Sequence, residues 1–105
     1  MRKQFKAWIT QDGTNDPIID LELNSIGNIA VTYNDVGGIT VSSNALFTGR
    51  VKAKITLQNG ANPNHSAGVN CVDSIPTAIN INTFISGVAA DDVLQSAYLE
   101  IECGL

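Results

Sequence analysis

Strict alternation of apolar and polar residues from position 50 to position 57 most strongly constrains what this chain can fold into. The apolar positions are Val51, Ala53, Ile55 and Leu57, and the polar positions are Arg50, Lys52, Lys54 and Thr56. Successive side chains of a β-strand point to opposite faces, so this period of two predicts a long strand with one buried and one solvated face. An amphipathic helix would need a period near 3.6 residues and is excluded for this segment.

Similar extended segments recur along the 105-residue chain and are separated by clusters of turn residues. Twelve Ile and eight Val favour strands as well, because β-branched side chains suit a pleated, half-buried surface. We therefore expect a single all-β domain over residues 1–105, a small antiparallel β-sandwich or jelly roll of six to eight strands. The expected strands cover residues 4–10, 18–23, 29–33, 39–43, 50–57, 69–75, 77–86 and 98–103.

The alternation also predicts which side chains are buried. The inward residues are Phe5, Ala7 and Ile9 in the first strand, Ile19, Leu21 and Leu23 in the second, and Leu99 and Ile101 in the last. A change of parity between Ile81 and Phe84 indicates a bulge or bend. Residues 89–97 are the one segment that could form a helical turn, capped by Asp91 and Asp92. The longest loop is expected at Asn59–Gly68, and a turn at Asp12–Pro17.

The few basic residues of this chain, whose net charge is −4, are concentrated in sequence. Arg50, Lys52 and Lys54 would form a row with a spacing of ~7 Å along one strand face. The row could bind an anion, or it could be neutralised by acids of matching spacing on neighbouring strands, Asp20/Glu22 and Glu100/Glu102. We favour neutralisation. With a negative net charge, we expect neither nucleic acid nor a membrane as a partner.

No recognisable catalytic, cofactor-binding or metal-binding motif is present, so we expect a non-enzymatic protein without a cofactor. Cys71 and Cys103 lack metal-ligand spacing, and thiols are favoured over a disulfide between them. The Asp12–Asp16 segment is rich in oxygen ligands but lacks the terminal glutamate of a calcium loop, which favours an ordinary turn. Trp8 would lie on the outer face beside Tyr98 or Tyr33, unless the face assignment is inverted and Trp8 belongs to the core.

The order of several short motifs resembles that of short uncharacterised β-sandwich proteins from tailed bacteriophages and prophages of the Bacteroidetes. The segments that carry the resemblance are Lys6–Pro17 (K-A-W-I-T-Q-D-G-T-N-D-P), Leu23–Ile29, Asp35–Gly38, Ala45–Thr48 and Asp91–Glu102 (D-D-V-L-Q-S-A-Y-L-E-I-E). The resemblance implies a small virion or tail-module protein of β-sandwich or jelly-roll form, often multimeric. It implies no catalytic residues.

From this resemblance we expect a phage virion structural protein: a tail-fibre, baseplate-associated or head-decoration component assembled in the host cytoplasm. It would act as a homo-oligomer, with a trimer as the first expectation, and would contact other virion proteins. The interface candidates are Trp8, Ile18, Arg50, Lys52 and Lys54.

The alternative is a small carbohydrate-binding or adhesin-type module that recognises surface glycans. Its candidate sites are Trp8, the Asn59–Gly68 loop and the Asp12–Asp16 loop. Either function fits a chain whose basic N-terminal residues are not followed by the apolar stretch of an export signal.

Overall fold

A computed structural model describes residues 3–43, 47, 50–71 and 78–104, apart from the side chain of Cys71. Over these residues the chain forms nine antiparallel strands and no helix, which confirms the all-β sandwich. The strands are β1 (Lys3–Asp12), β2 (Asn15–Asn24), β3 (Ile29–Asp35), β4 (Gly38–Ser43), β5 (Lys52–Thr56), β6 (His65–Cys71), β7 (Ala78–Ile85), β8 (Val88–Ala89) and β9 (Ala97–Cys103). The described part therefore contains no helix that could cross a membrane.

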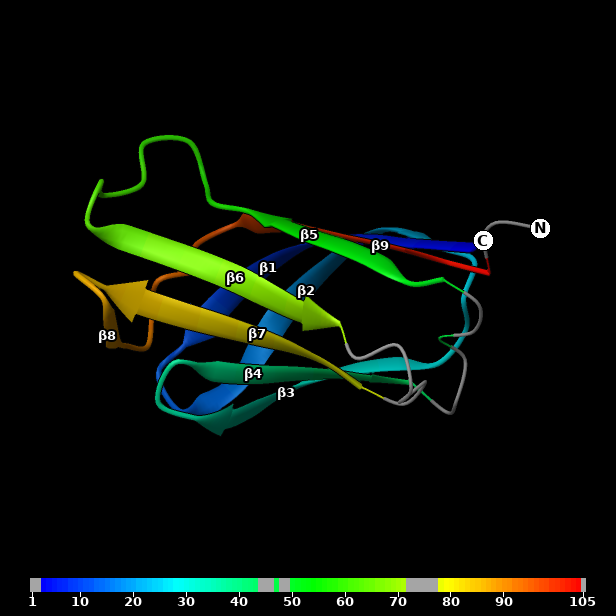
Figure 1. Cartoon of the computed structure of the whole chain (residues 1–105), viewed down its shortest axis with the longest axis horizontal. Coiled ribbons are helices and arrows are strands. Elements are labelled where there is room, and N and C mark those ends of the chain that lie inside the picture. The colour runs from blue at the N-terminus through cyan, green and yellow to red at the C-terminus, as the bar shows by residue number, and fades with distance from the viewer. Residues whose placement is uncertain (1–2, 44–46, 48–49, 72–77, 105) are drawn as a thin grey trace.

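Two sheets face each other (Figure 1). The first sheet has the order β2-β1-β9-β5, and the second has the order β3-β4-β7-β6 with β8 paired to β7. Their edges approach each other where β2 lies beside β3 and β5 beside β6. At the β2–β3 edge, the Asp16 carboxylate accepts a hydrogen bond from the backbone N–H of Tyr33 at 2.9 Å. This side-chain bond links the two sheets at that edge.

The strand order is that of a Greek-key sandwich. The order β3-β4-β7-β6, with β5 beside β9 in the opposite sheet, matches the A-B-E-D and C-F order of immunoglobulin-type sandwiches. β1, which pairs with the other side of β9, takes the place of the last strand of that order. The N-terminal strand is therefore central to the first sheet, and β2 is added outside it as an edge strand.

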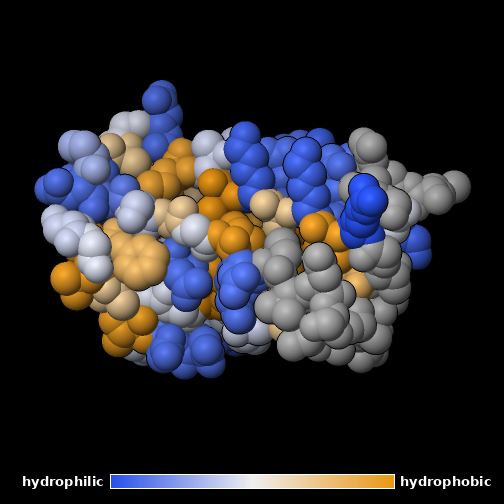
Figure 2. Space-filling view, viewed as in Figure 1, coloured by the Kyte–Doolittle hydropathy of each residue, from blue (hydrophilic) through white to orange (hydrophobic). Residues whose placement is uncertain are grey.

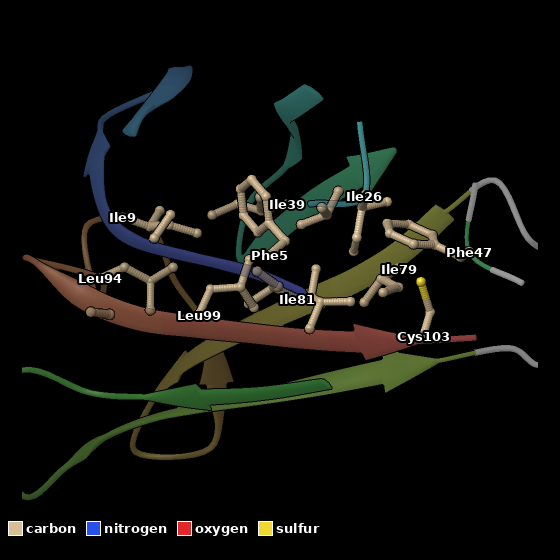
Figure 3. Close-up of a cluster of buried hydrophobic side chains, with 14 residues drawn as sticks. Phe5, Ile9, Ile26, Ile39, Phe47, Ile79, Ile81, Leu94, Leu99 and Cys103 are labelled. Carbon is tan, nitrogen blue, oxygen red and sulfur yellow. The ribbon is translucent and has the colours of Figure 1, made fainter. Parts of the chain in front are cut away.

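The core lies between the two sheets (Figure 3). β1 and β9 contribute to it by strict alternation, so the inward assignments of Phe5, Ala7, Ile9, Leu99 and Ile101 are confirmed. The second sheet contributes Ile39, Val41, Ile79 and Ile81. Ala53 and Ile55 of β5 pack against this core while Lys52 and Lys54 are exposed, as the alternation predicts. Arg50 is exposed but precedes β5, so the predicted strand was too long at its start.

The prediction for the second strand was wrong at Leu23, which faces outward and is 42% exposed, whereas Leu21 points inward as predicted but is 54% exposed. The register against β1 shifts between Lys6, which pairs with Leu23, and Ala7, which pairs with Leu21. Glu22 is the extra residue of a bulge, and the shift turns Leu23 to the outer face. Leu21 does point inward, opposite Ala7, but β2 is an edge strand and leaves it uncovered.

The turn expected at Asp12–Pro17 is much shorter in the structure. Asp12 already pairs with Asn15, which leaves Gly13 and Thr14 as a two-residue turn. Pro17 lies within β2 and is buried. A proline can occupy this strand because β2 lies at the edge of its sheet, where a ladder hydrogen bond is not required on both sides.

The expected change of parity in β7 does not occur. Ile79, Ile81 and Thr83 are all buried, and Phe84 lies on the opposite face. Thr83 can occupy an inner position because its hydroxyl donates to the carbonyl of Ala90 at 2.6 Å. No bulge or bend is therefore needed between Ile81 and Phe84, because the buried threonine hydroxyl has a hydrogen-bond partner within the fold.

Residues 89–97 form no helical turn; Val88 and Ala89 form β8, and an irregular segment follows. Leu94 is fully buried, and both its backbone groups bond to Gln11: the N–H donates to Oε1 and the carbonyl accepts from the backbone N–H, each at 2.8 Å. Gln11 thus supplies the partners that a helix would have supplied.

The loop expected at Asn59–Gly68 is also shorter, because β6 begins at His65. The strand expected at residues 69–75 therefore starts earlier than predicted. Its second half, residues 72–75, lies outside the described residues. Phe47, in the segment between β4 and β5, is buried.

Candidate functional site

The outer face of the first sheet brings together four of the five predicted interface residues: Trp8, Ile18, Lys52 and Lys54. Residues directly opposite in an antiparallel pair share a face, so the register defines this surface. Trp8 pairs with Tyr98 of β9, and Tyr98 pairs with Thr56 of β5. Ile18 of β2 pairs with Thr10, the next outward residue of β1 after Trp8. We call this surface the charged face.

The basic residues of β5 lie opposite acids of β9, as the sequence predicts. Lys52 pairs with Glu102 and Lys54 with Glu100, while Lys6 of β1 pairs with Glu100 from the other side. These four β5 and β9 residues line a shallow pocket of about 180 Å³. In Figure 2, hydrophilic side chains lie side by side over β5. The basic row therefore lies beside carboxylates of opposite charge, which is the arrangement that the neutralisation hypothesis requires.

The other predicted acids, Asp20 and Glu22, lie on the opposite edge of the sheet. Asp20 pairs with Trp8. Glu22 accepts a hydrogen bond from the hydroxyl of Tyr98 at 2.8 Å. The bulge that turns Leu23 outward also directs Glu22 over β1 to β9. These two acids therefore surround the aromatic residues and do not neighbour the basic strand.

Trp8 and Tyr98 form an aromatic pair on the charged face, with ring centroids 4.5 Å apart and planes inclined by 50°. Trp8 is 42% exposed, so its outward assignment is confirmed and Trp8 does not belong to the core. The hydrogen bond to Glu22, followed by desolvation and the charges of Glu22 and Glu100, raises the pKa of Tyr98 to about 12. Glu22 thus holds the Tyr98 ring in place and keeps its phenol protonated.

Exposed apolar side chains adjoin this pair. Ile18 is 61% exposed and Leu23 is 42% exposed, and both are on the charged face. A cluster of exposed large apolar residues with a charged surround is typical of a protein–protein contact. Ile18 was predicted as an interface residue from the sequence, whereas Leu23 was missed. Only a bulge assignment at Glu22 could have identified it.

One end of the sandwich carries the hairpin turns β1–β2 and β3–β4 (Figure 1). Asp92 accepts a hydrogen bond from the N–H of Gly13 at 2.8 Å. Asp91 accepts from the N–H of Gly37 at 3.0 Å and from the hydroxyl of Tyr33 at 3.1 Å. Desolvation, followed by the hydrogen bond from the Tyr33 hydroxyl to Asp91, raises the pKa of Tyr33. These carboxylates fasten both turns to the segment before β9.

The two loops considered for glycan binding also lie at this end, without forming a described pocket with Trp8. The loop after β5 is held by Gln58, whose amide donates to the carbonyl of Val93 at 3.2 Å and accepts from the N–H of Gln95 at 3.2 Å. The Asp12–Asp16 segment forms a two-residue turn, as favoured over a calcium loop. Among the described residues, no group of three His, Cys, Asp or Glu side chains could hold a metal ion.

A second pocket, of about 270 Å³, lies at the far end of the β3–β4 hairpin. It is lined by Asn28, Ile29, Ala30, Ser42 and Ser43. Cys103 is buried in the core, so it does not face either pocket. The side chain of Cys71 lies outside the described residues, so the preference for thiols over a Cys71–Cys103 disulfide stays a prediction.

Comparisons of the chain with protein-family models, with curated proteins and with solved structures identify no match.

Proposed function

We propose that this chain is a non-enzymatic structural protein of a bacteriophage virion and acts by assembling into a homo-oligomer. It would serve as a tail-fibre, baseplate-associated or head-decoration component that assembles in the host cytoplasm and contacts other virion proteins. Support for the phage context comes from the motif resemblance in Lys6–Pro17 and Asp91–Glu102. The subunit number, expected to be three, stays a prediction.

The observation that carries the proposal is the exposed apolar cluster on the charged face. Trp8, Ile18 and Leu23 each expose more than two-fifths of their surface on the same side of one sheet. Covering such side chains with a partner removes apolar area from water and gives ~25 cal/mol per Å². Trp and Tyr are also the residue types that most often anchor protein interfaces.

Sedimentation of the purified chain over a range of micromolar concentrations tests this proposal. The wild-type chain should form an oligomer, and the double variant Trp8→Ser/Ile18→Ser should dissociate to monomer. Val88→Ser is the matched control, since Val88 is 69% exposed on β8, away from the charged face, and its loss should not change assembly. A wild-type chain that stays monomeric and does not co-purify with virus particles contradicts the proposal.

A second candidate function is glycan recognition, which the Trp8–Tyr98 pair specifically favours. The exposed indole offers an apolar surface on which the C–H groups of a sugar ring can stack. Asp20 and Glu22 adjoin it and could accept hydrogen bonds from sugar hydroxyls. A glycan array without hits, together with association of the chain with particles, would leave only the structural role. Receptor-binding tail fibres would combine both functions.

A further inference from the structure

Charges on the charged face are arranged in columns that alternate in sign from strand to strand. β2 carries Asp20 and Glu22, and β1 carries Lys6. β9 carries Glu100 and Glu102, and β5 carries Lys52 and Lys54. From one edge of the sheet to the other, the signs are therefore negative, positive, negative, positive.

An alternating pattern over four strands is complementary to itself under one particular symmetry. A two-fold axis in the plane of contact, parallel to the strands and midway between β1 and β9, exchanges left and right. It places the acidic β2 column over the basic β5 column of a second copy, and the basic β1 column over the acidic β9 column. Each acidic strand then faces a basic strand. The register matches Lys6 with Glu100, and Glu22 with Lys54, of the second copy. Asp20 and Lys52 have no oppositely charged residue at their own level.

The other simple arrangement fails on the same grounds. A two-fold axis perpendicular to the strands would place each strand over the same strand of the second copy. Every column would then meet a column of its own sign, which opposes association. The charges thus select one orientation as well as permitting contact.

The favoured axis also brings the aromatic residues together. It leaves positions along the strands unchanged, so Trp8 lies over Tyr98 of the second copy, because the two residues are directly paired within the sheet. Leu23 and Glu22 of β2 lie over the level of Lys54 on β5. Two sheet faces packed in this way keep their strands within about 30° of each other, as aligned sandwiches do.

We infer that the charged face docks against the charged face of a second copy of this chain, across a two-fold axis parallel to its strands. The inference rests on the proposed homo-oligomeric function and names the partner and its orientation. A second copy is favoured over an unrelated protein because the pattern is already complementary to itself. A neutral glycan would leave the alternating charges without a role.

Two charge-reversed variants test the inference. Each should self-associate only weakly on its own, and the two should associate when they are mixed. One carries Lys54→Glu and the other carries Glu22→Lys, because these two residues face each other across the axis. In a dimer of either variant alone, like charges lie opposite each other at both β2–β5 contacts. Its self-association should therefore weaken by roughly tenfold or more. Mixed in equal amounts, the two variants restore opposite charges at both contacts and should recover the wild-type dissociation constant to within about threefold.

A control of matched charge is available on the second sheet. Asn70 and Asn82 are exposed on its outer face, so Asn70→Glu/Asn82→Glu adds charge away from the contact and should leave assembly unchanged. Circular dichroism verifies that each variant is folded. If a reversed variant does not fold, salt provides the test on the wild-type chain, whose self-association should weaken by about tenfold between low and high ionic strength.

The outcomes separate the inference from the proposed function. A wild-type chain that remains monomeric overturns both. An oligomer that is unaffected by either reversal and by salt, or two reversed variants that do not associate when mixed, overturns the two-fold docking and leaves oligomeric assembly standing. Recovery in the mixture alone supports the inference.

Discussion

The outer faces of the two sheets differ sharply in charge. The charged face of the first sheet holds seven charged residues in alternating columns. The outer face of the second sheet has one charged side chain among its described residues, Asp35, which pairs with Gly38 at the end of the sheet. Its other described positions carry no charge and include Ala30, Thr32, Thr40, Ser42, Ser66, Gly68, Asn70, Ala78, Asn80, Asn82 and Phe84. The low overall charge of the chain thus reflects one nearly uncharged face and not a uniformly sparse surface.

This difference indicates what the charges are for. Small hydroxyl and amide side chains are enough to solvate the second sheet, so solubility alone does not require the alternating columns of the first. Cross-strand neutralisation explains why opposite charges are neighbours, but not why they surround exposed apolar residues such as Trp8 and Ile18. That combination is the reason for assigning recognition to the first sheet.

The largest expected effect concerns the hairpin turns that close the two sheets. Gly37 has φ of +72°, and a Cβ there would lie 2.6 Å from the carbonyl oxygen of Thr83 and 2.9 Å from the N of Ala90. Gly37→Ala should destabilise the fold by roughly 3 kcal/mol, from left-handed strain plus collision with backbone atoms. Chemical denaturation measures the difference.

Gly13→Ala is the matched variant in the first sheet. Gly13 has φ of +57°, with no atom within 4 Å of the added Cβ, so only strain remains. The expected loss is about 1 kcal/mol. Equal losses for the two variants would show that the β3–β4 turn is not packed against β7 and β8 as described.

A smaller effect distinguishes the two outer faces directly. Glu100 lies between Lys6 and Lys54, so Glu100→Lys places three lysines in one row and should cost about 1–2 kcal/mol. Asn82→Lys introduces the same side chain on the outer face of the second sheet and should change stability by less than about 0.5 kcal/mol. Thermal or chemical denaturation at low salt compares them. Similar costs would contradict the cross-strand pairing of the charged face.

The smallest effect is a titration. Because the folded-state pKa of Tyr98 is about 12, above the model-compound value of 10.0, its contribution to stability is complete below pH 10 and is lost as pH rises through about 12. Tyrosinate absorbance should therefore show ionisation well above pH 10. Glu22→Gln should lower the pKa of Tyr98, and Tyr98→Phe assigns the signal. An unchanged titration in Glu22→Gln would exclude the Tyr98–Glu22 bond.

The sequence predicted the central strands well because their environment is regular. β1 and β9 are flanked on both sides, and strict alternation then sorts Phe5, Ile9, Leu99 and Ile101 into the core. The outward position of Trp8 followed from the same period. The pairing of Lys52 and Lys54 with Glu102 and Glu100 was predictable because equal spacing on adjacent strands brings such residues into register.

The sequence-based predictions were wrong mainly where a polar group finds its hydrogen-bond partner in a distant part of the chain. Thr83 is buried because Ala90 accepts its hydroxyl proton, and the segment around Leu94 needs no helix because Gln11 bonds its backbone. Leu23 faces outward because of one extra residue at Glu22. None of these partners is visible in a periodic pattern, which records only the average side of each strand.

The fluorescence emission of Trp8 during dilution tests the central claim most directly, since Trp8 is the single tryptophan and lies on the charged face. If that face is the assembly surface, emission should be blue-shifted in the oligomer and should move to the red as sedimentation shows dissociation. An oligomer that dissociates without any change in Trp8 emission would place the contact elsewhere and contradict the account.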